Sequence, residues 1–128
     1  MSKGMQEPTF LILAALAAGP QHGYGIMNEA EQLSGGVRRL QAGTLYAALE
    51  RLAGEGLVAA DREEVVEARF RRYYRLTDAG ARTLTEETAR RRTQAQAVTQ
   101  RLRAAGLATR AVDALTRPLT PPAIKGMP

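Results

Sequence analysis

The sequence predicts a mainly α-helical domain with a small β-hairpin, followed by a long helix. Apolar residues recur at helical spacing in three segments that end before Gly56. From Ala68 to Leu76 the spacing changes to a period of two, which is typical of a strand. Beyond Thr77, a favourable helix N-cap, helix-compatible sequence continues to about Ala105.

The composition allows a buried core without disulfides or a metal centre. Of the 128 residues, 45 % are hydrophobic, with no cysteine and one histidine. Disulfides and thiolate metal sites are excluded, and a site built on histidine and cysteine has too few ligands. No Ser/His/Asp or Cys/His arrangement is available, so we expect neither an enzyme nor a bound cofactor.

Two bulk properties indicate where the chain works and what it binds. The longest wholly apolar run, Phe10–Ala18, is far shorter than the roughly 20 residues that span a bilayer, and its flanks do not match a signal peptide. We therefore expect a cytoplasmic protein without a membrane segment. A net charge of +5 and a pI near 10.2 favour a polyanionic partner.

Three helices are expected before the hairpin. The first, Pro8–Ala18, is apolar on every side and must be covered all round. The second runs from about His22 to Leu33, and the third begins at Gln41 and is closed by Gly54. The short segment Val37–Leu40 between them is compatible with a strand.

The third helix has an unusually small outer face. Leu45, Leu49 and Leu52 fall on one stripe that would be buried. The opposite side carries only small residues beside a single Tyr46. Three helices with a hairpin form the winged helix-turn-helix plan, whose third helix enters the DNA major groove. A small outer face would let this helix approach base edges closely.

The hairpin is expected to pair Leu57–Arg62 with Ala68–Leu76 across an acidic turn, Glu63–Glu67. The period of two gives the second strand two faces. One face carries Phe70, Arg72, Tyr74 and Leu76. The other carries Arg69, Arg71, Tyr73 and Arg75. We expect this second, outer face to be strongly basic, although a solvated face is the usual role of such a charge run.

The long helix has a thin apolar seam. Its members are Leu84, Thr88, Arg91, Ala95, Val98, Leu102 and Ala105. Because so thin a stripe cannot hold a long helix alone, we expect a partner surface. Arg90–Arg92 is expected to be solvated or to pair with Glu86 and Glu87. A last short helix, Thr109–Leu115, and a mobile tail after Pro118 are also expected.

Four motifs together resemble the PadR family of transcriptional regulators over roughly residues 8–85. They are His22-Gly-Tyr-Gly-Ile26, Gly43-Thr-Leu-Tyr46, Gly56-Leu-Val58 and Arg71-Arg-Tyr-Tyr-Arg-Leu-Thr77. The resemblance implies a winged helix-turn-helix DNA-binding domain over 8–76 and a C-terminal helical dimerisation region over 77–117. The prolines at 118, 121 and 122 predict a flexible tail over 118–128.

The resemblance further implies a homodimeric repressor that binds a pseudo-palindromic operator in double-stranded DNA and is relieved by a small molecule or a stress signal. It places these residues at the DNA: His22, Tyr24, Gln41, Thr44, Tyr46, Arg69, Arg71 and Arg72. It places these at the dimer interface: Leu11, Leu84, Val98 and Leu102.

This chain departs from the family pattern at the recognition helix and the wing. The family usually has proline after the recognition-helix tyrosine, where this chain has Ala47, and often Ser-Pro where this chain has Gln41-Ala42. Its wing tip lacks the family's Gly-Arg-Pro-Arg, and an acidic tip would be repelled by phosphate. The alternative function is therefore a winged-helix protein–protein adaptor that does not read DNA.

Two residues keep a local alternative. Tyr46 is either close to DNA or a half-buried aromatic that flanks the core. Arg72 shares a face with Phe70 and Tyr74, and either contacts phosphate or pairs with an acid.

Overall fold

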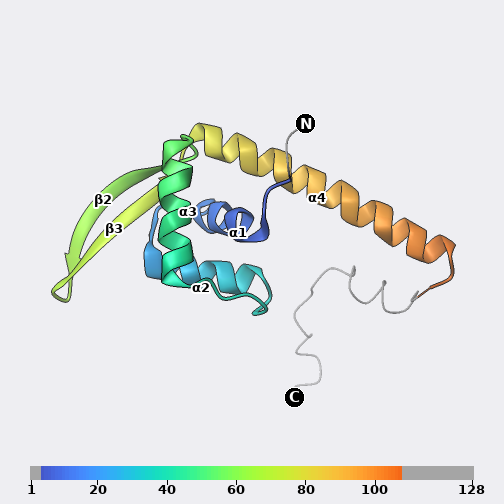
Figure 1. Ribbon diagram of the computed structural model, residues 1–128, viewed down its shortest axis with the longest axis horizontal. Coiled ribbons are helices and arrows are strands. Elements are labelled where there is room, and N and C mark those ends of the chain that lie inside the picture. Colours follow the sequence, from blue (N-terminus) through green and yellow to red (C-terminus); the bar gives the residue numbers. More distant parts are fainter. Residues whose placement is uncertain (1–3, 108–128) are drawn as a thin grey trace, which may run out of the picture. The chain divides into compact units, whose positions relative to one another are not determined.

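The computed structural model describes residues 4–107, in which four helices accompany a three-stranded antiparallel sheet (Figure 1). The helices are α1 Glu7–Leu16, α2 Gly23–Leu33, α3 Ala42–Gly54 and α4 Asp78–Ala104. The strands are β1 Gln21–His22, β2 Val58–Val66 and β3 Arg69–Leu76. The predicted class, mainly α with a small hairpin and a long following helix, is confirmed.

Helices α1, α2 and α3 enclose one aliphatic core. Its members are buried leucine, isoleucine, alanine and valine side chains: Leu11, Ile12, Leu13, Ala15, Leu16, Ile26, Ala30, Leu40, Leu45, Ala48, Leu49, Leu52 and Val58. Five of these come from α1, and their burial explains why the sequence of this helix is apolar on every side. The stripe Leu45, Leu49 and Leu52 is 0–1 % exposed, so it fixes the rotation of α3 about its own axis.

The hairpin is longer than the sequence predicted, and its turn is not acidic throughout. β2 and β3 pair up to Val66 and Arg69, so only Glu67 and Ala68 form the turn. Both turn residues have positive φ, 52° and 64°, as a two-residue turn matching the strand twist requires. The expected turn Glu63–Glu67 is therefore wrong. The acidic residues Glu63 and Glu64 belong to β2, where they pair with β3.

A bulge at Asp61 decides which residues share a face of the hairpin. The register shifts between Ala60, opposite Tyr74, and Arg62, opposite Tyr73. Beyond the bulge, Glu63 and Glu64 lie opposite Arg72 and Arg71 respectively. Each face of the hairpin therefore carries an acidic residue opposite an arginine. Figure 1 shows the two strands extending away from α3.

The sequence missed one strand and suggested another that is absent. Gln21 and His22 form β1, which pairs antiparallel with Tyr74 and Tyr73 and gives the sheet order β1-β3-β2. Two residues are too few to show alternation in a sequence. Val37–Leu40 forms no strand, although it places Leu40 in the core.

The ends of α4 match their expected signals. The Thr77 hydroxyl accepts a hydrogen bond from the Gly80 N–H at 3.0 Å, which satisfies a free donor at the helix start. At the other end Gly106 has φ +71°. Residues up to Ala89 belong to one compact unit, and a second begins at Arg90. The expected short helix Thr109–Leu115 and the tail after Pro118 lie outside the described residues.

Gly80→Ala is expected to destabilise the fold, because its methyl carbon would lie 2.0 Å from the Leu57 carbonyl oxygen, a backbone atom that cannot move aside. Crowding of this kind costs about 1–3 kcal/mol. Gly54→Ala is the control: nothing lies within 4 Å, and alanine favours the helix by up to about 1 kcal/mol. Urea unfolding measures both, and equal stabilities would contradict the packing described.

Candidate nucleic-acid interface

The first half of α3 presents an exposed face without charge. Gln41, Thr44 and Tyr46 are exposed, as are the small residues Ala42, Gly43 and Ala47, whereas Leu45 and Ala48 are buried. Gln41 is the N-cap residue, and its side chain makes no capping hydrogen bond. Glu50 is the first charged residue of the helix. Three of the predicted DNA-contacting residues therefore lie together on an open and narrow surface.

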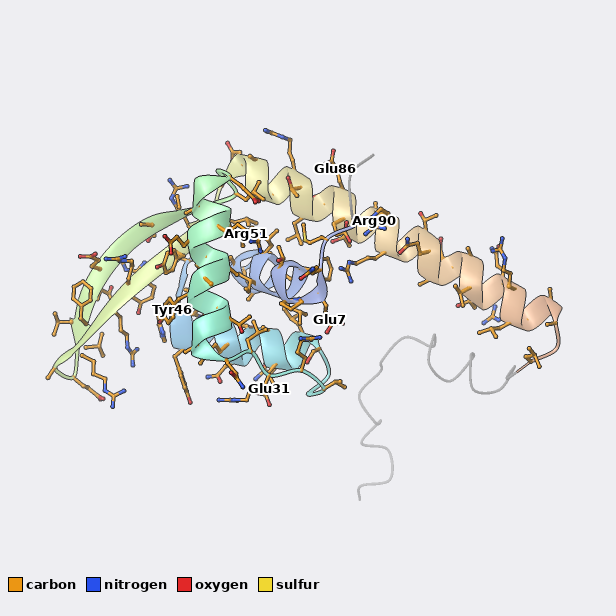
Figure 2. The ribbon with its side chains drawn as sticks, viewed as in Figure 1. Glu7, Glu31, Tyr46, Arg51, Glu86 and Arg90 are labelled. Carbon is orange, nitrogen blue, oxygen red and sulfur yellow. The ribbon has the colours of Figure 1, made fainter. Side chains whose placement is uncertain are left out.

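Tyr46 extends from this face toward the beginning of α2 (Figure 2). Its side chain is half exposed, at 51 %, and its hydroxyl end lies against the backbone of Gly23. Tyr24, the next residue of α2, is 60 % exposed. The start of α2 and the first half of α3 thus form one continuous surface.

His22 joins the start of α2 to the sheet. Its Nδ1 accepts a hydrogen bond from the Gly25 N–H at 3.3 Å, which caps α2. Its ring meets the ring of Tyr73 edge to face, with centroids 5.3 Å apart and an interplanar angle of 84°. His22 therefore has the structural role of a helix cap, beside any contact with phosphate.

The surroundings of His22 favour its neutral form. Burial lowers its pKa, and the positive charge of Arg71 lowers it further, while Glu64 opposes them. In a neutral ring whose Nδ1 accepts from Gly25, the proton is on Nε2. The Arg71 Nη1, 3.4 Å from Nε2, then cannot donate to it, and the guanidinium remains available to another acceptor.

Ion pairs within the hairpin neutralise much of its positive charge. Arg62 contacts Glu64 at 2.7 Å and Asp61 at 3.0 Å, and its guanidinium lies 4.0 Å from the centre of the Tyr73 ring. The hydrogen bond from Arg62 holds the pKa of Glu64 below its ordinary value. Arg75 lies 3.9 Å from Asp61. The outer face is therefore less basic than the sequence suggested.

The predicted wing arginines differ in their availability. Arg72 pairs with Glu63 at 3.3 Å, which confirms the alternative that it contacts an acid. Arg69 and Arg71 form no ion pair with any of residues 4–107. Arg69 is exposed and Arg71 half-buried. These two are the hairpin cations most free to bind a phosphate.

A hollow of about 330 Å³ brings most of the predicted residues together. It is lined by His22, Gly23, Tyr24, Tyr46, Arg69, Phe70, Arg71 and Arg72. Six of these were predicted from the sequence to lie at DNA. Thr44 on α3 and Gln41 at its N-cap lie outside the hollow. Phe70, 63 % exposed, also lines the hollow, although it was not among the residues predicted at DNA.

The segment before α3 has a plain structural role for its arginines. Arg38 pairs with Glu7 at 2.7 Å, and Arg39 pairs with Glu31 on α2 at 2.5 Å. The segment Val37–Leu40, for which the sequence suggested a strand, is irregular, and these two ion pairs connect it to α1 and α2 at the surface.

The residues predicted at a dimer interface differ in exposure. Leu11 is 4 % exposed, so the core of its own domain already covers it and leaves almost none of its side chain for a partner, and Leu84 is partly buried against that core. In the second unit Val98 is 56 % exposed and Leu102 half-buried. Within residues 4–107, no helix is long and apolar enough to cross a membrane, and no cluster of three metal-binding side chains occurs.

Comparison with known proteins agrees with this arrangement. Residues 12–86, more than half of the chain, match the model of the transcriptional regulator PadR-like family. A transcriptional regulator from Mycobacterium tuberculosis is 44 % identical over 57 residues, which are 44 % of this chain and 52 % of that protein. The chain spans about half or less of the length of the curated relatives that it matches.

Solved structures show the same fold. A PadR family transcription regulator from Clostridium difficile has a TM-score of 0.63 and 26 % identity, covering 76 % of this chain and 99 % of that one. Bacillus subtilis PadR in complex with operator DNA has a TM-score of 0.56 and 24 % identity, covering 63 % of this chain and 46 % of that one.

The stability of the fold is expected to fall as the pH drops below about 6.5, the ordinary pKa of histidine. Because the pKa of His22 is lowered on folding, the unfolded chain takes up its proton first, and protonation favours unfolding. The full contribution of neutral His22 to the stability of the fold is present above about pH 6.5 and is lost as the pH falls toward the lowered pKa of His22.

Urea unfolding between about pH 7.5 and 5.5 measures this loss, in a range where histidine is the principal titrating side chain. His22→Asn is the control, since asparagine keeps a helix-capping oxygen but does not titrate. As His22 is the single histidine of the chain, the variant should lose the slope. The same slope in both proteins would contradict the environment described for His22.

Proposed function

The chain belongs to the PadR-like family of transcriptional regulators, and from this premise we propose that it is a homodimeric repressor that binds a pseudo-palindromic operator in double-stranded DNA. The observation that carries the proposal is the exposed, uncharged face of α3 beside a hollow that holds Arg69 and Arg71. A narrow helix can enter the major groove, and the cations beside it can bind the backbone.

Base recognition is assigned to Gln41, Thr44 and Tyr46. The Gln41 amide has both donors and acceptors and makes no capping bond, so it is free to pair with a base edge. The Thr44 hydroxyl can donate or accept, and the Tyr46 ring offers apolar surface. Because the buried stripe of α3 fixes its rotation, these three side chains face outward together.

Backbone binding is assigned to the hairpin and the start of α2. Arg69 and Arg71 lack a carboxylate partner within residues 4–107, so no ion pair has to break before they meet a phosphate. Arg72 would first have to leave Glu63 and is expected to contribute less. His22 and Tyr24 line the same hollow and complete the proposed phosphate contacts.

The dimer is assigned to the long helix together with α1. Val98 is exposed and Leu102 half-buried on a helix whose surface is otherwise largely polar. A second copy would cover this thin seam. Two-fold symmetry then sets two recognition helices in successive major grooves, with half-sites about one helical turn apart. Release by a small molecule or a stress signal completes the proposal, and such a repressor works in the cytoplasm.

The first test is Tyr46→Ala, measured by fluorescence anisotropy on an operator obtained by binding-site selection from random duplexes. The variant is expected to lose specific binding, while size-exclusion chromatography still shows a dimer, because Tyr46 lies outside the core. Unchanged operator binding would remove α3 from the interface. No enrichment of any sequence by the wild type would favour the protein–protein adaptor.

The second test is the salt dependence of binding by Arg69→Ala and Arg71→Ala. Each lost phosphate contact lowers the slope of log K against log salt by about one, hence by about two for a dimer. Binding should weaken on all sequences. Arg82→Ala on α4 is the control, since Arg82 is outside the hollow, and its slope should match the wild type. Equal slopes in all four proteins would exclude the hairpin from the interface.

A further inference from the structure

Gly23 lies directly beneath the end of the Tyr46 side chain. A methyl carbon at position 23 would be 2.2 Å from the Tyr46 hydroxyl oxygen and 2.8 Å from Cζ, distances that atoms cannot adopt without moving. We propose that Gly23 is a positioning residue: by leaving this space empty it sets the direction of Tyr46, and so determines which DNA sequence the chain selects. The inference rests on the proposed function.

The backbone at position 23 does not itself require glycine. The glycines with positive φ are Gly19, Gly35, Gly36, Gly56 and Gly106 among residues 4–107, and Gly23 is not one of them. Gly23 is the first residue of α2, where alanine is favoured over glycine as a helix former. Position 23 therefore requires glycine because the Tyr46 side chain occupies the place of a Cβ atom, and not because of its backbone conformation.

The Gly23 backbone is held more firmly than the Tyr46 side chain. Its neighbour His22 is paired with Tyr73 in the sheet, caps Gly25 and packs edge to face on the Tyr73 ring. Gly23 itself is buried. Tyr46, by contrast, is half exposed and can rotate toward solvent. A methyl group at position 23 would therefore redirect the tyrosine and leave the fold in place.

This difference separates a positioning role from a structural one. A glycine that supports packing against backbone, such as Gly80 beneath the Leu57 carbonyl, lowers stability when it is replaced. A glycine that positions a surface side chain changes what that side chain contacts. Since a good base contact contributes roughly 1–3 kcal/mol of discrimination, a displaced Tyr46 should reduce the preference for operator over random DNA by about tenfold or more.

The test compares Gly23→Ala with the matched variant Gly25→Ala. The second adds the same methyl group to the same helix turn, but its nearest neighbours are side-chain atoms of Gln21 and not Tyr46. Gly23→Ala is expected to keep the melting temperature, the dimer and the salt slope of the wild type. Its specificity ratio should fall about tenfold, whereas Gly25→Ala should keep the wild-type ratio.

Binding-site selection shows whether Gly23 acts through Tyr46. Gly23→Ala should change base preference only at the operator positions that Tyr46→Ala also changes. Adding Tyr46→Phe, which removes the closest atom, should reduce the effect of Gly23→Ala. Changes at unrelated positions, a lowered melting temperature or an unchanged specificity ratio would each overturn the role of Gly23. A wild-type chain that selects no sequence would overturn the proposed function as well.

Discussion

Burial of one aliphatic stripe orients α3, and the remaining surface features depend on that orientation. Leu45, Leu49 and Leu52 are almost completely excluded from solvent, so α3 cannot rotate without opening the core. The opposite face, which carries Thr44 and Tyr46, is consequently presented outward. Because the stripe is buried, even a small residue such as Gly43 or Ala47 on that face has a defined position relative to the core.

The arginines of the hairpin fall into two groups with different electrostatic roles, which the sequence alone does not distinguish. Arg62, Arg72 and Arg75 pair with acidic residues of β2 and stabilise the hairpin itself. Arg69 and Arg71 are left for an external anion. Exposed ion pairs of this kind contribute little to stability individually. Their effect is to confine the available positive charge to the part of the hairpin that lines the hollow with Tyr46.

Local sequence signals predicted the helices well, because their causes are local. The α3 stripe, the Thr77 cap and Gly106 at the end of α4 each act within a few residues, and the bounds followed from them. The motifs of the family resemblance also assigned His22, Tyr24 and Tyr46 to one DNA-facing surface. Those residues do line a common hollow.

Features that depend on pairing between distant segments could not be predicted. β1 exists only because Gln21 and His22 meet β3, and the turn position follows from a ladder that carries Glu63 and Glu64 into β2. The bulge at Asp61, which sets Arg62 against Tyr73, has no sequence signal that we could identify. The contact between Gly23 and Tyr46 joins two helices, so it too depends on segments that are distant in the sequence.

Dimethyl sulfate protection of guanine N7 on a selected duplex tests the central claim most directly, because N7 lies in the major groove. The account predicts two protected patches about one helical turn apart, one for each copy of α3. Bound duplex with no protected N7, or with a single patch, would contradict the placement of α3 in successive major grooves.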